Sequence, residues 1–392
     1  MRKCSICDFS SQKKIYTQKF SIIGKKKAFI YDVVICLKCG FVFASNIPSQ
    51  KNYEKFYKEN TKYSFVDAEK EVPQAVKESN EYYYLLTETF LRNNFKRKRR
   101  DLRILDAGCG SGYLLSIFKK HGYKRLMGID PSPSCRILAK KLYGVDVKTF
   151  LISEFKDKKK FDLIILSNVL EHIEDLRNNL LYIASFLKEK GFLFISVPDG
   201  DNFGKVMREP FLEFSLEHIN YFTITSLTNL CKKFGLDKRH YESRKMETFG
   251  AYTSNSFWQK NGNKIGQKIT YDKSGEEKIR KYIFYSNKKQ EKIKKIISTL
   301  IQSSEELVIW GVGSLTSRLL ANTNLINANI KFFVDSNKAY QGKKIIGYKI
   351  LSPENLKNTK HTVLIASYVH SVGIRKTLEN NLGYKGKIIN LN

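Results

Sequence analysis

The fold is decided by residues 104–112, which read ILDAGCGSG. An apolar run there ends in Asp106. Glycines then recur at every second position: Gly108, Gly110 and Gly112. This pattern is typical of a strand that turns tightly into a helix, where a side chain would keep a ligand away from the backbone. A second apolar run ends in Asp130, and an acid about 20 residues after such glycines suits a ribose diol.

Two classes of ligand use such a turn. Dinucleotide-binding enzymes place a pyrophosphate there, whereas enzymes that use S-adenosylmethionine (SAM) place an amino acid and a sulfonium there. Asp106 favours SAM, because a carboxylate repels phosphate and attracts the cationic end of SAM. The segment resembles motif I of class I SAM-dependent methyltransferases. That resemblance implies that Asp106, the three glycines and Asp130 bind the cofactor.

The size and composition of the chain indicate a protein of two or three domains. Its 392 residues exceed one typical domain, and 42% hydrophobic with 13% aromatic residues suffice for buried cores. No apolar stretch approaches the length of a membrane span, and no apolar signal region opens the chain. We therefore expect a cytoplasmic protein with no membrane partner. The sequence leaves the oligomeric state open, a monomer included.

The formal net charge of +31 allows two interpretations. A basic patch would serve nucleic acid, but the lysines are scattered, with one dense cluster at residues 96–100. We therefore favour an anionic small-molecule substrate, such as a nucleotide sugar, over nucleic acid.

Four of the seven cysteines form two Cys-x2-Cys pairs. The pairs consist of Cys4, Cys7, Cys36 and Cys39. In a cytoplasmic chain, such pairs predict a tetrahedral Zn²⁺ site rather than disulfides. Four thiolates leave no open position for water, so we expect a structural zinc ion.

The order of apolar runs predicts an α/β protein with a doubly wound parallel sheet of the class I SAM-methyltransferase type. Strands are expected at 103–106, 126–130, 145–149, 161–166 and 191–197. The predicted domains are a zinc-binding module (1–66), a methyltransferase domain (67–260), a helical connector (261–304) and a C-terminal Rossmann-like α/β domain (305–392). Apolar residues at helical spacing over 276–301 predict an amphipathic connector helix. In the last domain, Gly311 and Gly313 form only a weak dinucleotide fingerprint, and we expect this domain to shape the substrate cleft.

Ligands of open α/β sheets lie beyond the carboxyl ends of the strands. The segment after the fourth strand therefore brings Asn168, Glu171 and His172 beside the cofactor. The pair Glu154 and Phe155 follows the third strand and is expected to flank the adenine ring.

The order of these features resembles the nucleotide-sugar C-methyltransferases of deoxysugar biosynthesis. Members of that family combine a zinc module, a SAM domain and a C-terminal Rossmann-like domain, and they methylate a carbon beside the ketone of an NDP-4-keto-6-deoxy sugar. The resemblance implies active-site roles for Glu217 and His218, which precede Tyr221-Phe222, and for His172. It also implies a substrate contact for Tyr63, with Tyr57 as a competitor. Family members often carry a tyrosine two residues before the glutamate, where this chain has Ser215.

Methylation of such a carbon requires removal of a proton to form an enolate. A histidine suits this role at neutral pH, so we expect His218 to be the base and Glu217 either to orient its imidazole or to contact a sugar hydroxyl. His172 and Tyr63 would donate hydrogen bonds to the developing oxyanion.

Three alternatives to carbon methylation remain. They are a sugar O-methyltransferase, a zinc-containing RNA methyltransferase and a protein that binds SAM without catalysis. The RNA interpretation is weakened by Ser167-Asn168-Val169-Leu170 after the fourth strand, which lacks the Asn/Asp-Pro-Pro-Tyr type of motif used on exocyclic amines.

Overall fold

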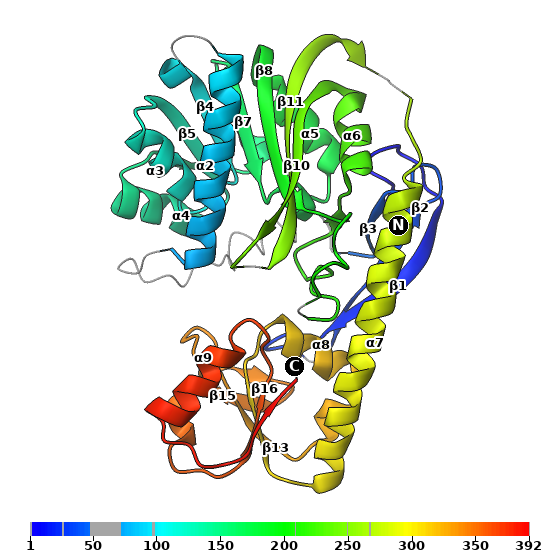
Figure 1. Cartoon of the computed structure of the whole chain (residues 1–392), viewed down its shortest axis with the longest axis vertical. Coiled ribbons are helices and arrows are strands. Elements are labelled where there is room, and N and C mark those ends of the chain that lie inside the picture. Colours follow the sequence, from blue (N-terminus) through cyan, green and yellow to red (C-terminus); the bar gives the residue numbers. More distant parts are fainter. Residues whose placement is uncertain are drawn as a thin grey trace.

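The computed structural model describes residues 2–25, 27–47, 72–95, 99–207, 209–248, 250–265 and 268–391. Tyr57 and Tyr63 lie outside these ranges, as does the predicted domain boundary at residue 66. Figure 1 shows the methyltransferase sheet at one end of the molecule, a smaller α/β unit at the other, and the long helix α7 (Lys273–Ser303) along one side.

The large sheet has seven strands in the order β10-β11-β8-β7-β4-β5-β6. These are β4 (Arg103–Ala107), β5 (Arg125–Asp130), β6 (Val147–Thr149), β7 (Phe161–Ser167), β8 (Leu187–Pro198), β10 (Phe234–Met246) and β11 (Ala251–Ile265). Strands β4 to β8 run parallel, and β11 runs antiparallel to β8. The five predicted strands are confirmed, and so is the class I methyltransferase fold. Strand β11 continues past residue 260, the predicted end of this domain.

Helices cover both faces of the sheet, which explains why its central strands are apolar along their middle residues. In β7, the four consecutive residues Leu163 to Leu166 are fully buried. The helices are α2 (Gln74–Asn94), α3 (Tyr113–Lys120), α4 (Pro133–Leu138), α5 (Leu176–Ser185) and α6 (Ile224–Lys233).

The N-terminal module forms a four-stranded antiparallel sheet whose last strand comes from far along the chain. Its order is β1 (Gln12–Phe20), β2 (Phe29–Cys36), β3 (Val42–Ser45) and β9 (Asn220–Tyr221). Phe41 of this module packs on Phe222, with ring centroids 5.4 Å apart. Module and methyltransferase sheet therefore share one hydrophobic core.

Helix α7 confirms the predicted amphipathic helix and joins two separate cores. Its first half packs Ile279 and Tyr282 against the N-terminal module. Its second half packs Ile293 and Ile297 against the C-terminal unit.

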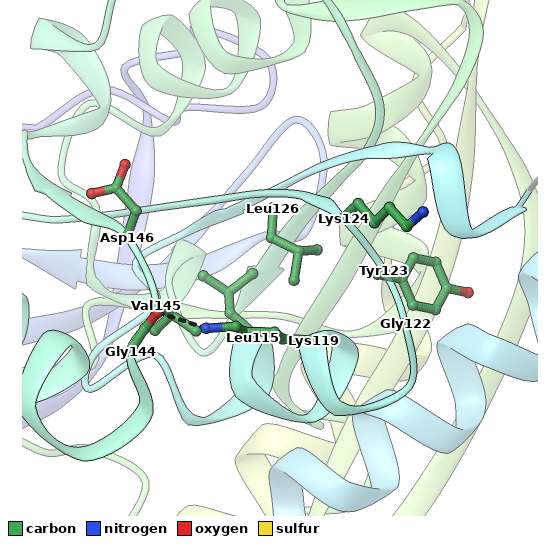
Figure 2. A pocket seen from close by; sticks show the side chains of 9 residues that line it. All are labelled: Leu115, Lys119, Gly122, Tyr123, Lys124, Leu126, Gly144, Val145 and Asp146. Atoms are coloured by element: carbon green, nitrogen blue, oxygen red, sulfur yellow. Dashed lines mark hydrogen bonds between the residues drawn. The ribbon is translucent and has the colours of Figure 1, made fainter.

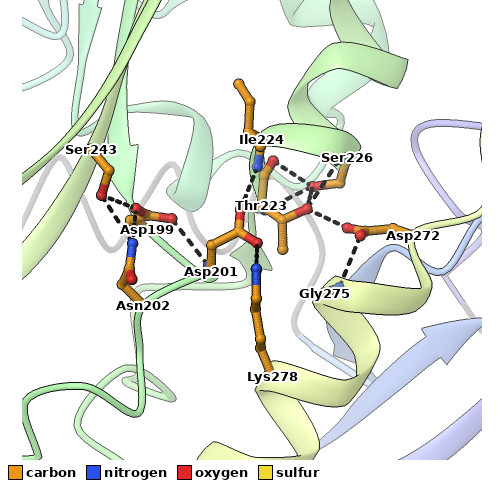
Figure 3. Close-up of polar contacts among 10 residues, drawn as sticks. All are labelled: Asp199, Asp201, Asn202, Thr223, Ile224, Ser226, Ser243, Asp272, Gly275 and Lys278. Carbon is orange, nitrogen blue, oxygen red and sulfur yellow. Dashed lines mark hydrogen bonds and ion pairs between the residues drawn. The ribbon is translucent and has the colours of Figure 1, made fainter.

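A polar network fixes the start of α7 to the methyltransferase domain (Figure 3). Asp272 caps the helix by accepting from Gly275 N at 3.0 Å, and it also accepts from the Thr223 hydroxyl of the α6 cap. One turn later, Lys278 Nζ contacts Asp201 at 2.6 Å. These contacts attach the start of the helix to the methyltransferase domain.

The C-terminal unit has a six-stranded sheet in the order β14-β15-β13-β12-β16-β17, parallel except for β14. Its elements are β12 (Leu307–Trp310), α8 (Ser314–Asn322), β13 (Ile330–Val334), β14 (Lys344–Ile345), β15 (Tyr348–Leu351), β16 (Thr362–Ile365), α9 (Ser371–Lys376) and β17 (Ile388–Asn390). The predicted α/β character of this region is confirmed.

Helix α8 docks the C-terminal unit onto the rest of the chain. Ser21 N donates to the Ser317 carbonyl at 2.9 Å, and the buried guanidinium of Arg318 forms an ion pair with Glu209. No helix in the described part of the chain is long and apolar enough to cross a membrane.

Candidate active site

The glycine turn between β4 and α3 adopts a backbone that favours glycine at all three positions. The φ angles of Gly108, Gly110 and Gly112 are 86°, 52° and 75°. A Cβ on Gly108 would lie 2.5 Å from Val169 Cγ2, and one on Gly112 would lie 2.7 Å from Val145 Cγ2. The glycines are therefore required by backbone conformation and packing, in addition to the ligand approach expected from the sequence.

Asp106 lies at the base of this turn and is 1% exposed. Its Oδ1 has no hydrogen-bond partner among the described residues. Burial, with a further contribution from Asp130, raises the pKa of the Asp106 carboxyl to about 7. A buried carboxylate oxygen without a donor is costly, so this position suits a cationic ligand group such as the ammonium of SAM.

Asp130 ends β5 and ties the glycine turn to the next loop. It accepts from Gly110 N at 3.0 Å and from Ser132 N at 2.9 Å. Burial raises the pKa of Asp130, while these two amides oppose the shift. The two bonds fix the direction of the carboxylate, and its predicted contact with a ribose stays a prediction.

The other three predicted cofactor contacts lie in different surroundings. Asn168 is exposed at the end of β7, with a left-handed φ of 54° and its amide donating to Tyr83 Oη at 3.3 Å. Glu154 is also exposed and ends a 3-10 turn. The Phe155 ring is buried in the core, 5.0 Å from the Phe186 ring between centroids. An adenine contact by that ring would require it to leave this packing.

A second group of polar residues gathers from two distant segments. Glu171 and His172 end the 3-10 turn after β7, and Glu217 and His218 precede β9. The rings of His172 and His218 lie 5.0 Å apart between centroids. Nδ1 of His172 lies 3.0 Å from the Glu217 carbonyl, and its Nε2 lies 3.8 Å from the Glu171 carboxylate. The structure thus brings together the three described residues predicted to act in catalysis.

Ser215 organises the turn that carries Glu217 and His218. Its hydroxyl accepts from the backbone N–H groups of both residues, at 3.2 and 3.0 Å. Its carbonyl accepts from the Tyr31 hydroxyl at 2.8 Å. A tyrosine side chain at this position would not reach back to these two amides, so the serine has a local structural role of its own.

Arg2 and Asn220 hold the two catalytic segments together, and sequence reasoning missed both. Asn220, 2% exposed, donates to the carbonyls of Leu170 and Ile173, at 2.8 Å each. Its Oδ1 accepts from Arg2 Nη2 at 2.8 Å, and the same guanidinium nitrogen reaches the Glu174 carbonyl at 2.7 Å. The N-terminal module therefore fixes the loop of His172 relative to that of His218.

Two further groups with raised pKa values were also not predicted. Burial raises the pKa of the Glu213 carboxyl to about 7. Tyr340 of the C-terminal unit has a raised pKa, chiefly through burial and further through the negative charges of Asp335 and Glu217. The C-terminal unit therefore places a phenol within electrostatic range of Glu217. An isolated Glu or Tyr in a loop carries no sequence signal of such a position.

The four paired cysteines come together as predicted. Sγ of Cys4 lies 3.5 Å from that of Cys39, and Sγ of Cys7 lies 3.3 Å from that of Cys36. A tetrahedral zinc ion with Zn–S bonds of about 2.3 Å sets its sulfurs about 3.8 Å apart, so the residues fit such an ion. The cysteine cluster also contacts the start of α7, because the Cys39 carbonyl accepts from Asp272 N at 3.0 Å.

A surface hollow of about 460 Å³ lies away from these groups (Figure 2). It lies at the amino ends of β5 and β6 and is lined by two residues of α3, by residues of the loops that precede these strands and by the start of β5: Leu115, Lys119, Gly122, Tyr123, Lys124, Leu126, Gly144, Val145 and Asp146. The glycine turn lies at the opposite, carboxyl edge of the sheet. We therefore assign no part of the reaction to this hollow.

Two families match separate parts of the chain. Residues 79–241 match the family described as "Methyltransferase domain". Residues 303–389 match the family described as "C2185-like, N-terminal". Together with the strand order, the first match shows that the chain carries a class I SAM-dependent methyltransferase domain.

Curated relatives match a shorter part. The ubiquinone biosynthesis O-methyltransferase of Rhodopseudomonas palustris is 32% identical over 101 residues, which is 24% of this chain and 39% of that protein. The protein of the same name from a Bradyrhizobium species is 35% identical over the same length. The match therefore spans about two fifths of these relatives.

Among solved structures, the 1,6-didemethyltoxoflavin-N1-methyltransferase of Burkholderia thailandensis is similar to this chain. It is 17% identical, with a TM-score of 0.42, and the alignment covers 58% of this chain and 98% of that one.

Proposed function

We propose that this protein transfers a methyl group from SAM to a small molecule. The support is the glycine turn and the buried Oδ1 of Asp106, which has no hydrogen-bond partner in the part of the chain that the structure describes, within a methyltransferase domain. Asp106 would hold the ammonium of SAM, and Asp130 the ribose. When bound, SAM supplies an activated methyl group, so the protein must align the acceptor and make it nucleophilic.

We further propose that the acceptor is a carbon beside the ketone of a nucleotide-linked deoxysugar. The observation that carries this proposal is the pairing of His172 and His218, 5.0 Å apart between ring centroids, with the Glu217 carbonyl 3.0 Å from Nδ1 of His172. A base and a hydrogen-bond donor in this arrangement could deprotonate a carbon acid and stabilise the enolate oxygen. The positive charge of the chain suits a diphosphate-linked substrate.

The hydrogen bond of His172 determines how that residue can act. A carbonyl can only accept, so Nδ1 of His172 carries a proton that it donates to Glu217 O. Nε2 can then donate to an oxyanion only when the ring carries a second proton. The Glu171 carboxylate, 3.8 Å from Nε2, stabilises that imidazolium. This leaves His218 as the base that removes the sugar proton, with Glu217 beside it.

The zinc proposal concerns structure rather than chemistry. We propose that Cys4, Cys7, Cys36 and Cys39 hold one Zn²⁺ with no open coordination position. The ion would stabilise the module that, through Arg2 and Asn220, holds the catalytic loops. Removal of zinc should therefore lower both stability and turnover.

Methylation at a sugar oxygen is the second candidate, because the curated relatives are named O-methyltransferases. It also needs a base, so the same histidines serve it. The two candidates differ in whether a C–H proton beside the ketone is exchanged with solvent.

Mass spectrometry distinguishes these outcomes. Purified protein is incubated with SAM in D2O, together with a panel of NDP-4-keto-6-deoxy sugars and their reduced counterparts. A gain of one methyl group on keto sugars only, with deuterium entering beside the ketone, supports carbon methylation. A gain on reduced sugars without such exchange indicates oxygen methylation, and no gain on any sugar rejects the sugar proposal in favour of another acceptor such as RNA.

A further inference from the structure

Among the described residues, one group of side chains besides the four cysteines has the composition of a metal site. Glu171, His172 and His218 each offer one ligand atom, and these atoms all lie within 4.8 Å of one another. Two imidazoles and one carboxylate form the ligand set of zinc sites that keep a fourth position open. The group lies close to the cofactor turn, because Val169, two residues before Glu171, packs on Gly108.

The surroundings of His172 match those of a metal-bound histidine. Such residues usually donate their other ring N–H to a carbonyl or carboxylate, which fixes the tautomer and the ring direction. Here Nδ1 of His172 lies 3.0 Å from the Glu217 carbonyl. The neutral ring therefore carries its lone pair on Nε2, the nitrogen that lies 3.8 Å from the Glu171 carboxylate.

The distances allow coordination after side-chain rotations. Nitrogen and oxygen ligands about 2.1 Å from a tetrahedral ion lie about 3.4 Å apart, so no pair of ligand atoms has to close by more than about 1.4 Å. The Glu171 side chain is 1% exposed and that of His172 is 20% exposed. This burial strengthens the attraction between the carboxylate and a divalent ion.

We propose that Glu171, His172 and His218 form a second metal site for a divalent transition ion such as Zn²⁺ or Co²⁺. The ion would bind through the His218 lone pair that removes the sugar proton, so metal and substrate compete for one atom. Binding of the ion displaces any ligand proton to solvent, and it leaves every bond of the substrate intact. The competition between metal ion and sugar rests on the proposed function, whereas binding of the metal ion does not.

Binding is tested on the full chain without any methyl acceptor. The cysteine site is first filled with one equivalent of Zn²⁺, and Co²⁺ is then added under equilibrium dialysis with elemental analysis. We expect one Zn²⁺ and one Co²⁺ per chain. The bound Co²⁺ should give the weak visible absorption of nitrogen and oxygen ligands rather than intense thiolate charge transfer.

Variants assign the second ion. Glu171→Gln and His218→Asn should each lose the Co²⁺ and retain the Zn²⁺, whereas His370→Asn, a change at an exposed histidine of the C-terminal unit, should retain both. Retention of Zn²⁺ and an unchanged circular dichroism spectrum show that a variant is folded. One ion per wild-type chain, or a second ion that persists in both cluster variants, would overturn the site.

Competition between the metal ion and the sugar substrate is measured from turnover, once a methyl acceptor has been found. Co²⁺ should inhibit competitively against the sugar, and His370→Asn should be inhibited to the same degree. Stoichiometric binding without inhibition would reject the shared atom. Absence of turnover with every acceptor would refute the proposed function, while the dialysis result still decides the site.

Discussion

The ionisation of Asp106 predicts how affinity for the cofactor depends on pH. Burial raises the pKa of this carboxyl to about 7. A bound ammonium favours the carboxylate, so the pKa falls when the cofactor binds and a proton is released. Affinity should therefore rise with pH up to about 8. With an apo pKa of about 7, affinity at pH 6 should be about tenfold weaker than at pH 8, which corresponds to about 1.4 kcal/mol.

The assay is isothermal titration calorimetry with S-adenosylhomocysteine, which keeps the amino group of SAM and cannot react. Titrations in buffers of different ionisation enthalpy give the number of protons released. We expect about 0.9 proton at pH 6 and about 0.1 at pH 8. The Asp106→Asn variant should bind more weakly at pH 8 and should lose most of both pH effects.

The apo protein provides a control of opposite sign. Because the folded pKa of Asp106 lies above its unfolded value, protonation stabilises the fold at low pH, and this stability is lost as pH rises through about 7. Without ligand, Asp106→Asn should therefore gain Tm relative to wild type between pH 5 and 8. An affinity independent of pH in wild type, or an unchanged slope in the variant, would refute the assignment of Asp106 to the ammonium.

Three further predictions concern the stability of the fold. Gly108→Ala should cost about 2–4 kcal/mol in the free energy of unfolding, since the left-handed φ and the contact with Val169 Cγ2 both oppose a Cβ. Adding Val169→Ala relieves only the contact, so it should restore only part of the lost stability. Full restoration, measured by chemical denaturation, would contradict a contribution from φ. Asn220→Ala should cost about 2–4 kcal/mol in the free energy of unfolding, because the carbonyls of Leu170 and Ile173 lose the buried amide that donates to both. It should lower kcat by a larger factor than it changes KM, and a change in KM alone would argue against a role of Asn220 in positioning the loop of His172. Glu209→Ala should cost about 3–5 kcal/mol in the free energy of unfolding, because it leaves the buried Arg318 charge without its carboxylate partner. The Glu209→Met/Arg318→Met double variant should regain most of that stability. Additive losses in denaturant unfolding would show that the two residues are not coupled.

Local patterns made the methyltransferase half predictable. Strand β7 is apolar along its buried centre because helices cover both faces of the sheet, and that run is visible in the sequence. The glycines and Asp106 lie within nine residues, and each cysteine pair within four. Such features depend on short-range geometry, so their chemistry can be inferred before the fold is known.

The parts that the sequence did not reveal depend on contacts between distant segments. Strand β9 has two residues, too few for any periodicity, yet it joins the N-terminal sheet to the loop of His218. The hydrogen bond between Arg2 and Asn220 spans 218 positions. For Phe155 the local sequence is ambiguous, because an aromatic residue after a strand can either contact a ligand or pack in the core. In the structure its ring is buried in the core.

The central claim is that His218 removes a proton beside a ketone before methyl transfer. It is tested most directly by incubating the protein with S-adenosylhomocysteine and an NDP-4-keto-6-deoxy sugar in D2O and following deuterium at the carbon beside the ketone by NMR. The account predicts exchange in wild type without any methyl transfer, and loss of that exchange in His218→Asn with cofactor affinity retained. Exchange that persists in the variant, or an absence of exchange in a wild-type protein that methylates the same sugar, would contradict it.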